Sequence, residues 1–142
     1  MIIIITKSNE SNPHLGLTLC IALATNGVDL ADCFNDFTCL KQSGESFVIA
    51  RAWRSYGVFE TCGPSNIQNA RNAGIEYVDV YMFPCRGLSA SSQVSSLISG
   101  LSSALGEEEF EVGREMLESS YGVIWLDIEI NPSGGCGWGT DY

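Results

Sequence analysis

The sequence predicts an α/β fold in which about four parallel strands with covering helices form the N-terminal part of a (β/α) TIM-like barrel. Strand-like apolar runs alternate with helix signals, and each strand–helix–strand crossover returns the chain in the same direction. The runs are almost continuously apolar, as in parallel strands that are covered on their outside. The last two runs also sort into an aliphatic face and a polar-aromatic face.

Period-two alternation defines these two faces. The aliphatic face is predicted to carry Val78, Val80, Met82, Ile124, Leu126, Ile128 and Ile130. The polar-aromatic face is predicted to carry Tyr77, Asp79, Tyr81, Phe83, Trp125, Asp127 and Glu129. An open doubly wound sheet would be aliphatic on both faces because helices cover both. The difference therefore favours the outside and the inside of a barrel whose interior holds a site.

The first half of the chain contains two predicted strands and one predicted helix. Gly27–Leu30 is a short strand candidate. Asn35 or Asp36 can cap a helix over Phe37–Gln42, and a glycine shortly after it ends the helix. Phe47–Trp53 is a continuous run of β-prone residues, and a loop with glycine and proline follows it.

The second half repeats the alternation. Ser65 is predicted to cap a helix over residues 66–73, and Tyr77–Phe83 is the third strand, which a proline ends. A longer helix follows, with a single apolar stripe at helical spacing made of Val94, Leu97, Ile98, Leu101 and Leu105. Val123–Ile130 is the fourth strand.

Composition and charge limit the partners. The chain has 142 residues, of which 45% are hydrophobic and 17% charged, as expected for one globular domain. Seven Lys and Arg against 17 Asp and Glu give a net charge of −10. Such a chain repels phosphate backbones and anionic membrane surfaces, so we expect no nucleic-acid partner. No apolar run approaches the roughly 18 residues of a spanning helix, so we expect no membrane anchor. The oligomeric state is left open.

Residues 1–24 are predicted to be a signal peptide. Leu15–Ala24 is apolar and closes with Ala22-Leu23-Ala24, the small-x-small pattern that signal peptidase reads, so the mature chain is expected to start at Thr25. A buried strand followed by a buried helix is the alternative. Cleavage would remove His14, the single histidine, and with it histidine-based catalysis and metal ligation. No nucleotide-binding glycine motif occurs, and we expect no cofactor and no bound metal.

The cysteines indicate an oxidising compartment. Six in so short a chain favour secretion or the lysosomal or phagosomal lumen. Cys20 lies in the predicted signal peptide, which leaves Cys33, Cys39, Cys62, Cys85 and Cys136. Five is an odd number, so one thiol is expected to lack a partner within this chain. No spacing is C-x-x-C, which disfavours a zinc ribbon or a thioredoxin-like motif.

Polar and aromatic side chains are predicted to meet at the carboxyl ends of the strands. Asp127 and Glu129 are two residues apart on a strand, so both project from the same face. The other strands end in Asp29, in Arg51, Trp53 and Arg54, and in Tyr81 and Phe83. Glycoside hydrolysis requires this combination: a protonated acid for the leaving oxygen, an ionised partner for the developing positive charge, and flat surfaces for sugar rings.

Other roles for these residues stay open at this point. Strand carboxylates are more often solvated or ion-paired than catalytic, and Arg51 can be such a partner. Divalent metal binding also uses carboxylate oxygens. Asp79 lies in mid-strand and is favoured as a buried polar neighbour of the site. Trp125 and Trp138 can be ordinary core and loop anchors.

Four segments together carry a family resemblance. They are Gly27–Leu30, Ser46–Ala52, Ala73–Ile75 leading into Val80–Phe83, and Trp125–Gly134. The last holds the D-x-E strand with its Asn-Pro-Ser-Gly tail and is the most specific. They resemble glycoside hydrolase family 25, the lysozymes (N-acetylmuramidases) of the Chalaropsis type, and in particular its cysteine-rich eukaryotic branch, the secreted lysozymes of protists and nematodes.

The resemblance implies cleavage of the β-1,4 bond between N-acetylmuramic acid and N-acetylglucosamine in bacterial peptidoglycan, for antibacterial defence or for digestion of bacteria. It implies that Glu129 is the general acid/base and that Asp127 stabilises the transition state, by orienting the 2-acetamido group of the substrate. It implies that Asp29 supports both electrostatically. The residues expected to contact substrate are Tyr81, Trp53, Arg51 and Phe83.

The predicted domain spans residues 25–142, and the resemblance covers it from about Gly27 to Tyr142. An acidic run at about 106–119 is excepted, and we expect it to be a solvated helical insertion. A complete barrel takes roughly 200 residues or more, so we expect an incomplete barrel that is truncated after the D-x-E strand. Two other functions stay open. One is a non-catalytic glycan-binding or regulatory remnant, and the other is a metal-dependent hydrolase with Asp29, Asp127 and Glu129 as ligands.

Overall fold

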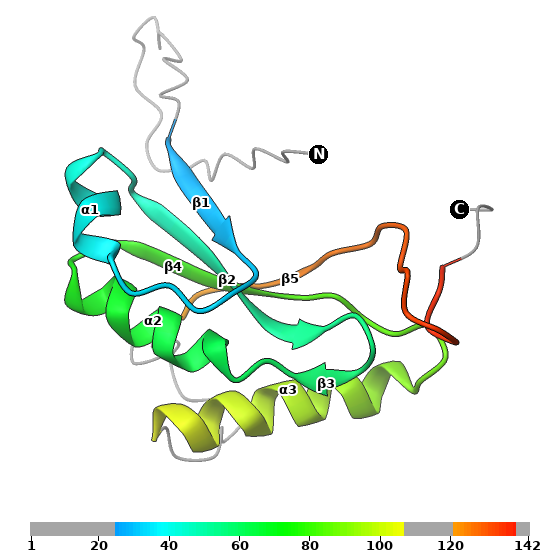
Figure 1. The fold of residues 1–142 in the computed structure, drawn as a ribbon. Coiled ribbons are helices and arrows are strands. Elements are labelled where there is room, and N and C mark those ends of the chain that lie inside the picture. The colour runs from blue at the N-terminus through cyan, green and yellow to red at the C-terminus, as the bar shows by residue number, and fades with distance from the viewer. Residues whose placement is uncertain (1–24, 107–120, 139–142) are drawn as a thin grey trace, which may run out of the picture.

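A computed structural model describes residues 25–106 and 121–138. Its centre is a sheet with the strand order β1-β2-β4-β5, and all neighbours in this order are parallel (Figure 1). These strands are β1 (Gly27–Leu30), β2 (Phe47–Arg54), β4 (Tyr77–Met82) and β5 (Ile124–Leu126). The predicted α/β arrangement with a parallel sheet is confirmed. The predicted signal peptide and residues 107–119 of the acidic run lie outside the described residues.

Two of the helices begin where the sequence places a capping side chain. Helix α1 (Phe37–Gln42) has the predicted bounds, because an Asp36 carboxylate oxygen accepts a hydrogen bond from a backbone N–H in its first turn. Helix α3 (Ala90–Leu105) follows Ser89, whose hydroxyl caps it in the same way. It ends at Gly106, which has a left-handed φ of +70°.

Helix α2 (Cys62–Asn72) begins earlier than predicted, and Ser65 is not its cap. No side chain caps this helix. Pro64 lies in the first turn, where a missing N–H removes no helical hydrogen bond. Gly63 lets the helix approach β2 closely, since a Cβ at this position would lie 2.7 Å from the Arg51 carbonyl oxygen. Packing against the strand therefore determines where α2 starts.

A short hairpin extends β2 in a stretch that the sequence predicts to be loop. Strand β3 (Val58–Phe59) pairs antiparallel with the end of β2, with Phe59 opposite Trp53. Gly57 makes the turn with a φ of +85°, a conformation that favours glycine. β4 pairs with one edge of β2 as far as Trp53. β3 therefore pairs with the opposite edge, the one that β1 uses in the first half of β2.

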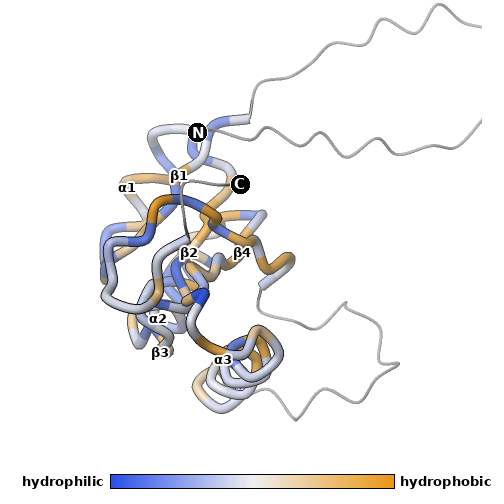
Figure 2. Tube along the Cα trace, turned by 90° about the vertical axis from the view of Figure 1, so that its right-hand side faces the viewer, coloured by the Kyte–Doolittle hydropathy of each residue, from blue (hydrophilic) through white to orange (hydrophobic). Residues whose placement is uncertain are grey.

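One face of the sheet is covered by α2 and α3, and α1 packs against α2 (Figure 1). Figure 2 shows hydrophobic stretches in the strands and in α3 with hydrophilic residues between them. The core between sheet and helices contains Val48, Ala50, Val78, Val80, Met82, Ile67, Ala70, Leu97 and Leu101, whereas Val94 of the predicted stripe is exposed. None of the described helices is long and apolar enough to cross a membrane.

Strand β5 is shorter than the predicted run 123–130, and its aliphatic side chains are covered only at its start, where Ile124 packs against the core. Leu126 is 63% exposed, although its register partner Met82 is fully buried. Ile128 and Ile130, beyond the strand, are also exposed. Among the described elements β5 contacts only β4, so neither helix reaches over it.

Candidate active site

The D-x-E carboxylates lie just beyond β5. The backbone N–H of Asp127 donates to the Met82 carbonyl oxygen at 2.9 Å, so the parallel ladder continues for one residue past the strand. This bond holds Asp127 against the sheet, where it is half-buried. Glu129 follows in the segment beyond and is exposed. The two carboxylates therefore have different environments although they are two residues apart.

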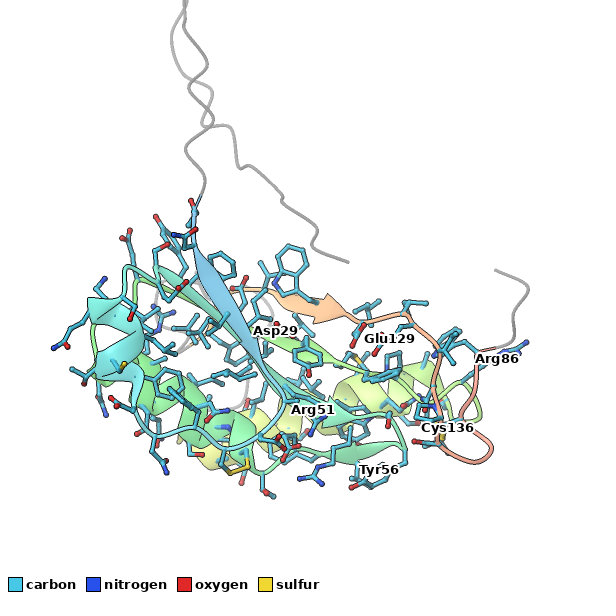
Figure 3. All side chains as sticks on the ribbon, turned by 45° about the horizontal axis from the view of Figure 1, so that its top comes forward. Asp29, Arg51, Tyr56, Arg86, Glu129 and Cys136 are labelled. Atoms are coloured by element: carbon cyan, nitrogen blue, oxygen red, sulfur yellow. A yellow bond between two sulfur atoms is a disulfide. The ribbon has the colours of Figure 1, made fainter. Side chains whose placement is uncertain are left out.

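Strand register brings Arg51, Tyr81 and Asp29 to one face of the sheet. Arg51 is paired with Tyr81, and Tyr81 with Trp125, so the three side chains form one row across β2, β4 and β5. Asp29 belongs to the row before it, through its pairing with Ile49. Figure 3 shows Asp29, Arg51 and Glu129 around this region. We call the face that carries these rows the inner face, and the helix-covered face the outer face.

The pKa values show that the inner-face groups interact. Burial raises the pKa of Asp127, and the negative charges of Glu129 and Asp29 raise it further. Burial also raises the pKa of Tyr81. The positive charge of Arg51 lowers this pKa, and the negative charges of Asp29 and Asp127 raise it further. Asp29, Asp127 and Glu129 therefore lie within electrostatic reach of one another, and we call them the carboxylate cluster.

Arg51 has a partner that the sequence reading missed. This partner is Glu60, which is only 1% exposed. Its Oε2 accepts two hydrogen bonds from Arg51, at 2.9 and 3.1 Å. Its Oε1 accepts one from Arg54, at 2.7 Å. It lies directly after β3, a strand of two residues with no periodicity to reveal it. The local signal was Gly57 between two β-prone stretches, which indicates a hairpin.

The two arginines keep Glu60 ionised. Burial alone would raise the pKa of Glu60, but hydrogen bonds from Arg54, from the Cys62 backbone and from Arg51 outweigh burial and lower it. Bonds to Glu60 and Tyr56 in turn raise the pKa of Arg54, so its guanidinium stays protonated. The inner face thus carries a fixed Arg51–Glu60–Arg54 network beside the carboxylate cluster.

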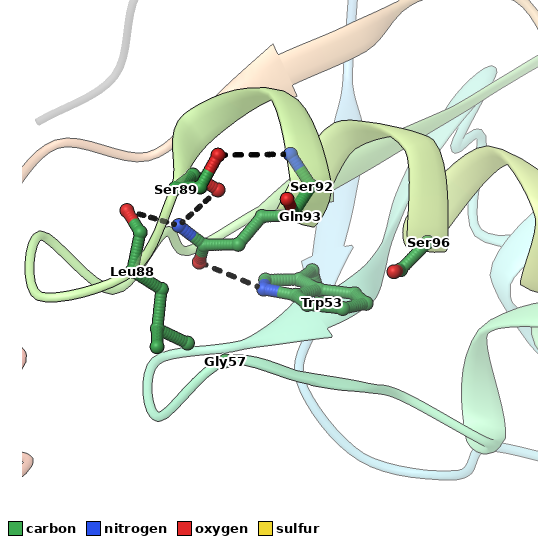
Figure 4. A pocket seen from close by; sticks show the side chains of 7 residues that line it. All are labelled: Trp53, Gly57, Leu88, Ser89, Ser92, Gln93 and Ser96. Carbon is green, nitrogen blue, oxygen red and sulfur yellow. Dashed lines mark hydrogen bonds between the residues drawn. The ribbon is translucent and has the colours of Figure 1, made fainter.

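Trp53 does not reach the predicted rim. A β-bulge between Arg51 and Trp53 shifts the register of β2, so Ala52 and Trp53 are both buried on the outer face. The Trp53 indole N–H donates to Gln93 Oε1 of α3 at 3.1 Å, beside an open pocket next to that helix (Figure 4). Trp53 is therefore a core residue, and its prediction as a substrate contact is wrong. Phe83 follows β4 and is half-buried.

Asp79 stabilises the start of β5. Its two carboxylate oxygens accept hydrogen bonds from the Val123 backbone, at 2.9 Å, and from the Trp125 indole, at 2.8 Å. Gly122 makes room for it, since a Cβ there would lie 2.5 Å from Asp79 Oδ1. Asp79 is thus a half-buried structural neighbour of the site, as predicted.

The segment after Glu129 is fixed to the ends of β2 and β4. The buried Asn131 side chain donates to the Ser55 carbonyl oxygen at 2.7 Å, and the Ser55 and Ser133 hydroxyls are 2.9 Å apart. The Cys85–Cys136 disulfide closes this loop, and Cys33–Cys62 joins the end of β1 to α2. Cys39 is the free cysteine of the described chain.

Metal ligation was one of the open alternatives. Within residues 25–106 and 121–138, no three His, Cys, Asp or Glu side chains are grouped closely enough to hold a metal ion.

Comparison with known proteins identifies relatives. A family model described as "Lysozyme-like protein 1" matches residues 22–114, more than half of the chain, and ends before Asp127. "Probable GH family 25 lysozyme 2" of Dictyostelium discoideum is 40% identical over 109 residues, 75% of this chain. "Lysozyme-like protein 5" of Caenorhabditis elegans is 34% identical over 114 residues, 77% of this chain. "Counting factor 45-1" of Dictyostelium discoideum is 32% identical over 106 residues, 74% of this chain.

The matches cover only part of the relatives. They span 45% of the Dictyostelium lysozyme, 47% of the Caenorhabditis protein and 31% of the counting factor, so the chain spans about half the length of the lysozyme-like relatives. No solved structure matches. The family model covers three of the four segments that suggested the resemblance, and Trp125–Gly134 lies beyond its end. The chain belongs to the lysozyme-like family, and within it to the glycoside hydrolase family 25 type found in protists and nematodes.

Proposed function

We propose that this chain carries the catalytic carboxylates of a lysozyme that cleaves the β-1,4 bond between N-acetylmuramic acid and N-acetylglucosamine in peptidoglycan. The observation that carries the proposal is the carboxylate cluster, in which Asp29 lies near the end of β1 and Asp127 and Glu129 follow β5 within electrostatic reach of it. In a parallel α/β sheet this end is the usual place for a site. The lysozyme names of its relatives support the reaction class.

The two D-x-E residues have complementary roles in this mechanism. Glu129, exposed and free to reach a glycan, donates its proton to the leaving oxygen and later removes a proton from water. Asp127, half-buried and close to the sheet, supplies the negative charge opposite the positive charge that develops on the sugar, and orients its 2-acetamido group. Burial and the charges of Glu129 and Asp29 raise the pKa of Asp127, so Asp127 holds its proton to a higher pH than an isolated carboxyl would and supplies its negative charge only above that pH.

Other inner-face residues position the glycan. Tyr81 lies next to Arg51 in the row below Asp127, and its ring offers a flat surface for a sugar. Phe83, half-buried directly after β4, is the second aromatic residue that we propose to contact the glycan. Asp29 adds negative charge within electrostatic reach of Tyr81. Arg51, held by Glu60, adds a positive charge beside Tyr81.

The sheet suits one side of a (β/α) barrel. Parallel strands with helices on one face and a charged, aromatic opposite face are expected of a barrel wall. Two disulfides favour an oxidising compartment, such as the extracellular space or a lysosomal or phagosomal lumen, where a lysozyme meets bacteria for defence or digestion.

The test is lysis of bacterial cell walls by the full chain and by Glu129→Gln. An amide keeps the shape of the side chain but cannot deliver a proton, so we expect a loss of about 10² to 10⁴-fold. Glu76→Gln is the matched control, because Glu76 is also exposed but precedes β4, at the opposite end of the sheet. We expect it to retain full lysis and the wild-type melting temperature.

Three other outcomes would contradict the proposal. Full activity of Glu129→Gln would remove Glu129 from the acid role. Lysis that a chelator abolishes would favour a metal-dependent hydrolase. A wild-type chain that binds glycan without cleaving it would favour a non-catalytic, regulatory role, which the similarity to a counting factor makes a specific alternative.

A further inference from the structure

The β-bulge in β2 brings a second arginine to the inner face. Ala52 and Trp53 are both buried against the helices, so the alternation of β2 restarts one residue later. Arg54 therefore returns to the side of the sheet that Arg51 occupies. Both guanidinium groups meet on the carboxylate of Glu60, which confirms that they share this side.

The network leaves one positive charge uncompensated, and Arg54 presents it to solvent. Two guanidinium groups share one carboxylate, so the network has a net charge of about +1. Glu60 is 1% exposed, Arg51 22% and Arg54 37%. A negatively charged ligand on the inner face would meet Arg54 first, because Arg51 is covered more deeply and lies against Tyr81.

Arg54 still has hydrogen-bond donors to offer. A guanidinium carries five N–H groups, and among the described residues Arg54 donates one to Glu60 and one to the Tyr56 hydroxyl, at 3.1 Å. Because Tyr56 accepts that bond, its own O–H proton can point to a ligand. Tyr56 is 49% exposed. The pair therefore offers N–H and O–H donors from groups that Glu60 holds in place.

The pair lies next to the segment that carries the proposed acid. Ser55, the next residue after Arg54, accepts the Asn131 side-chain bond and contacts Ser133. Asn131 is two residues after Glu129. A glycan whose scissile bond lies at Glu129 can thus place a neighbouring substituent near Arg54 and Tyr56.

We propose that Arg54 and Tyr56 form a specificity-determining site that binds a carboxylate group of the glycan substrate. This inference rests on the proposed lysozyme function. A chain of net charge −10 with three carboxylates in its site would repel an anionic glycan unless a cation compensates. Muramic acid carries a lactyl carboxylate, and peptide stems carry further carboxylates, whereas a polymer of N-acetylglucosamine alone is neutral. Arg54 would thus select an acidic glycan over a neutral one.

The experiment measures binding of three oligosaccharides of equal length to the full chain. The first alternates N-acetylglucosamine with N-acetylmuramic acid and has free lactyl carboxylates. The second carries peptide stems on the lactyl groups, and the third is a neutral chitooligosaccharide. We expect the wild type to bind at least one acidic ligand about tenfold more tightly than the neutral one, with the difference shrinking as salt rises. Preference for the first or the second identifies the lactyl or the peptide carboxylate.

Variants separate the site from a merely structural ion pair. Arg54→Gln is expected to lose the tenfold preference and to keep its affinity for the neutral ligand. Tyr56→Phe leaves the bonds between Arg54 and Glu60 in place and is expected to lose about two- to fivefold toward the acidic ligand only. Lys41→Gln removes the same charge from the exposed last turn of α1 and is expected to change nothing.

The outcomes distinguish this inference from the proposed function. Equal acidic-ligand affinities of wild type, Arg54→Gln and Tyr56→Phe would overturn the carboxylate site, and lysis that depends on Glu129 would still support the lysozyme. A wild type that binds none of the three oligosaccharides would overturn both. If Arg54→Gln fails to fold, Tyr56→Phe decides alone.

Discussion

The two faces of the sheet differ in role although the same strands form both: the outer face packs against helices, and the inner face carries the candidate site. On the outer face Val48, Val78 and Val80 are fully buried against α2 and α3. On the inner face their alternating neighbours Asp79 and Tyr81 remain partly accessible and take part in hydrogen bonds or charge interactions. Substitutions on the outer face should therefore act on stability, and substitutions on the inner face should act mainly on function.

Trp53 tests this comparison most strongly, because the bulge moves it from the predicted rim to the outer face. Trp53→Ala is expected to lower the free energy of unfolding by about 3 to 5 kcal/mol, as for other buried aromatic residues. Denaturant unfolding measures this value. Tyr81→Phe on the inner face should change it little. A stable Trp53→Ala variant with weakened glycan binding would return Trp53 to the site.

The Cys85–Cys136 disulfide contributes both to stability and to the site, since it fixes the loop that follows Glu129 to the end of β4. Replacing both cysteines with Ser should lower the free energy of unfolding by about 2 to 4 kcal/mol. Cys39→Ser is the control, and we expect it to stay within about 0.5 kcal/mol of the wild type because Cys39 is exposed and free. An unchanged melting temperature of the double variant would show that Asn131 and its neighbours hold the loop without the disulfide.

The pH dependence of stability should distinguish Glu60 from Asp127. The pKa of Glu60 is lower in the folded chain than its ordinary value of 4.5, so its stabilisation is present above that pH and is lost as the pH falls. The pKa of Asp127 is raised above its ordinary 3.8, so its contribution has the opposite sign. Melting temperatures between about pH 6 and 3 should therefore fall less steeply for Glu60→Gln than for the wild type. A steeper fall would contradict the ion-pair assignment.

Apolar periodicity was sufficient to predict the parallel strands and the side chains of β4 that face the helices, whereas the site roles of Asp29, Asp127 and Glu129 stay predictions. It could not predict the bulge at Trp53, because a register shift arises between strands and leaves the local alternation of β-prone residues unchanged. It also missed Glu60, whose role depends on a two-residue strand and on partners that a turn brings together.

Strand β5 shows a further limit of periodicity. Leu126 alternates as a buried residue would and is paired with the fully buried Met82, yet it is largely exposed. Alternation identifies the face on which a side chain lies, but burial depends on whether another element covers that face. Neither α2 nor α3 contacts β5.

The most direct test compares Asp127→Asn with Asp79→Asn, two identical changes on the inner face. Cell-wall lysis and thermal unfolding are measured for both. Asp127→Asn should reduce lysis by about 10² to 10³-fold and keep or raise the melting temperature, because it removes a charge that burial and its neighbours disfavour. Asp79→Asn should lower the melting temperature, since one amide oxygen replaces two acceptors, and should retain lysis per folded molecule. An active Asp127→Asn variant, or a stable but inactive Asp79→Asn variant, would contradict the assignment of chemistry to Asp127 and of structure to Asp79.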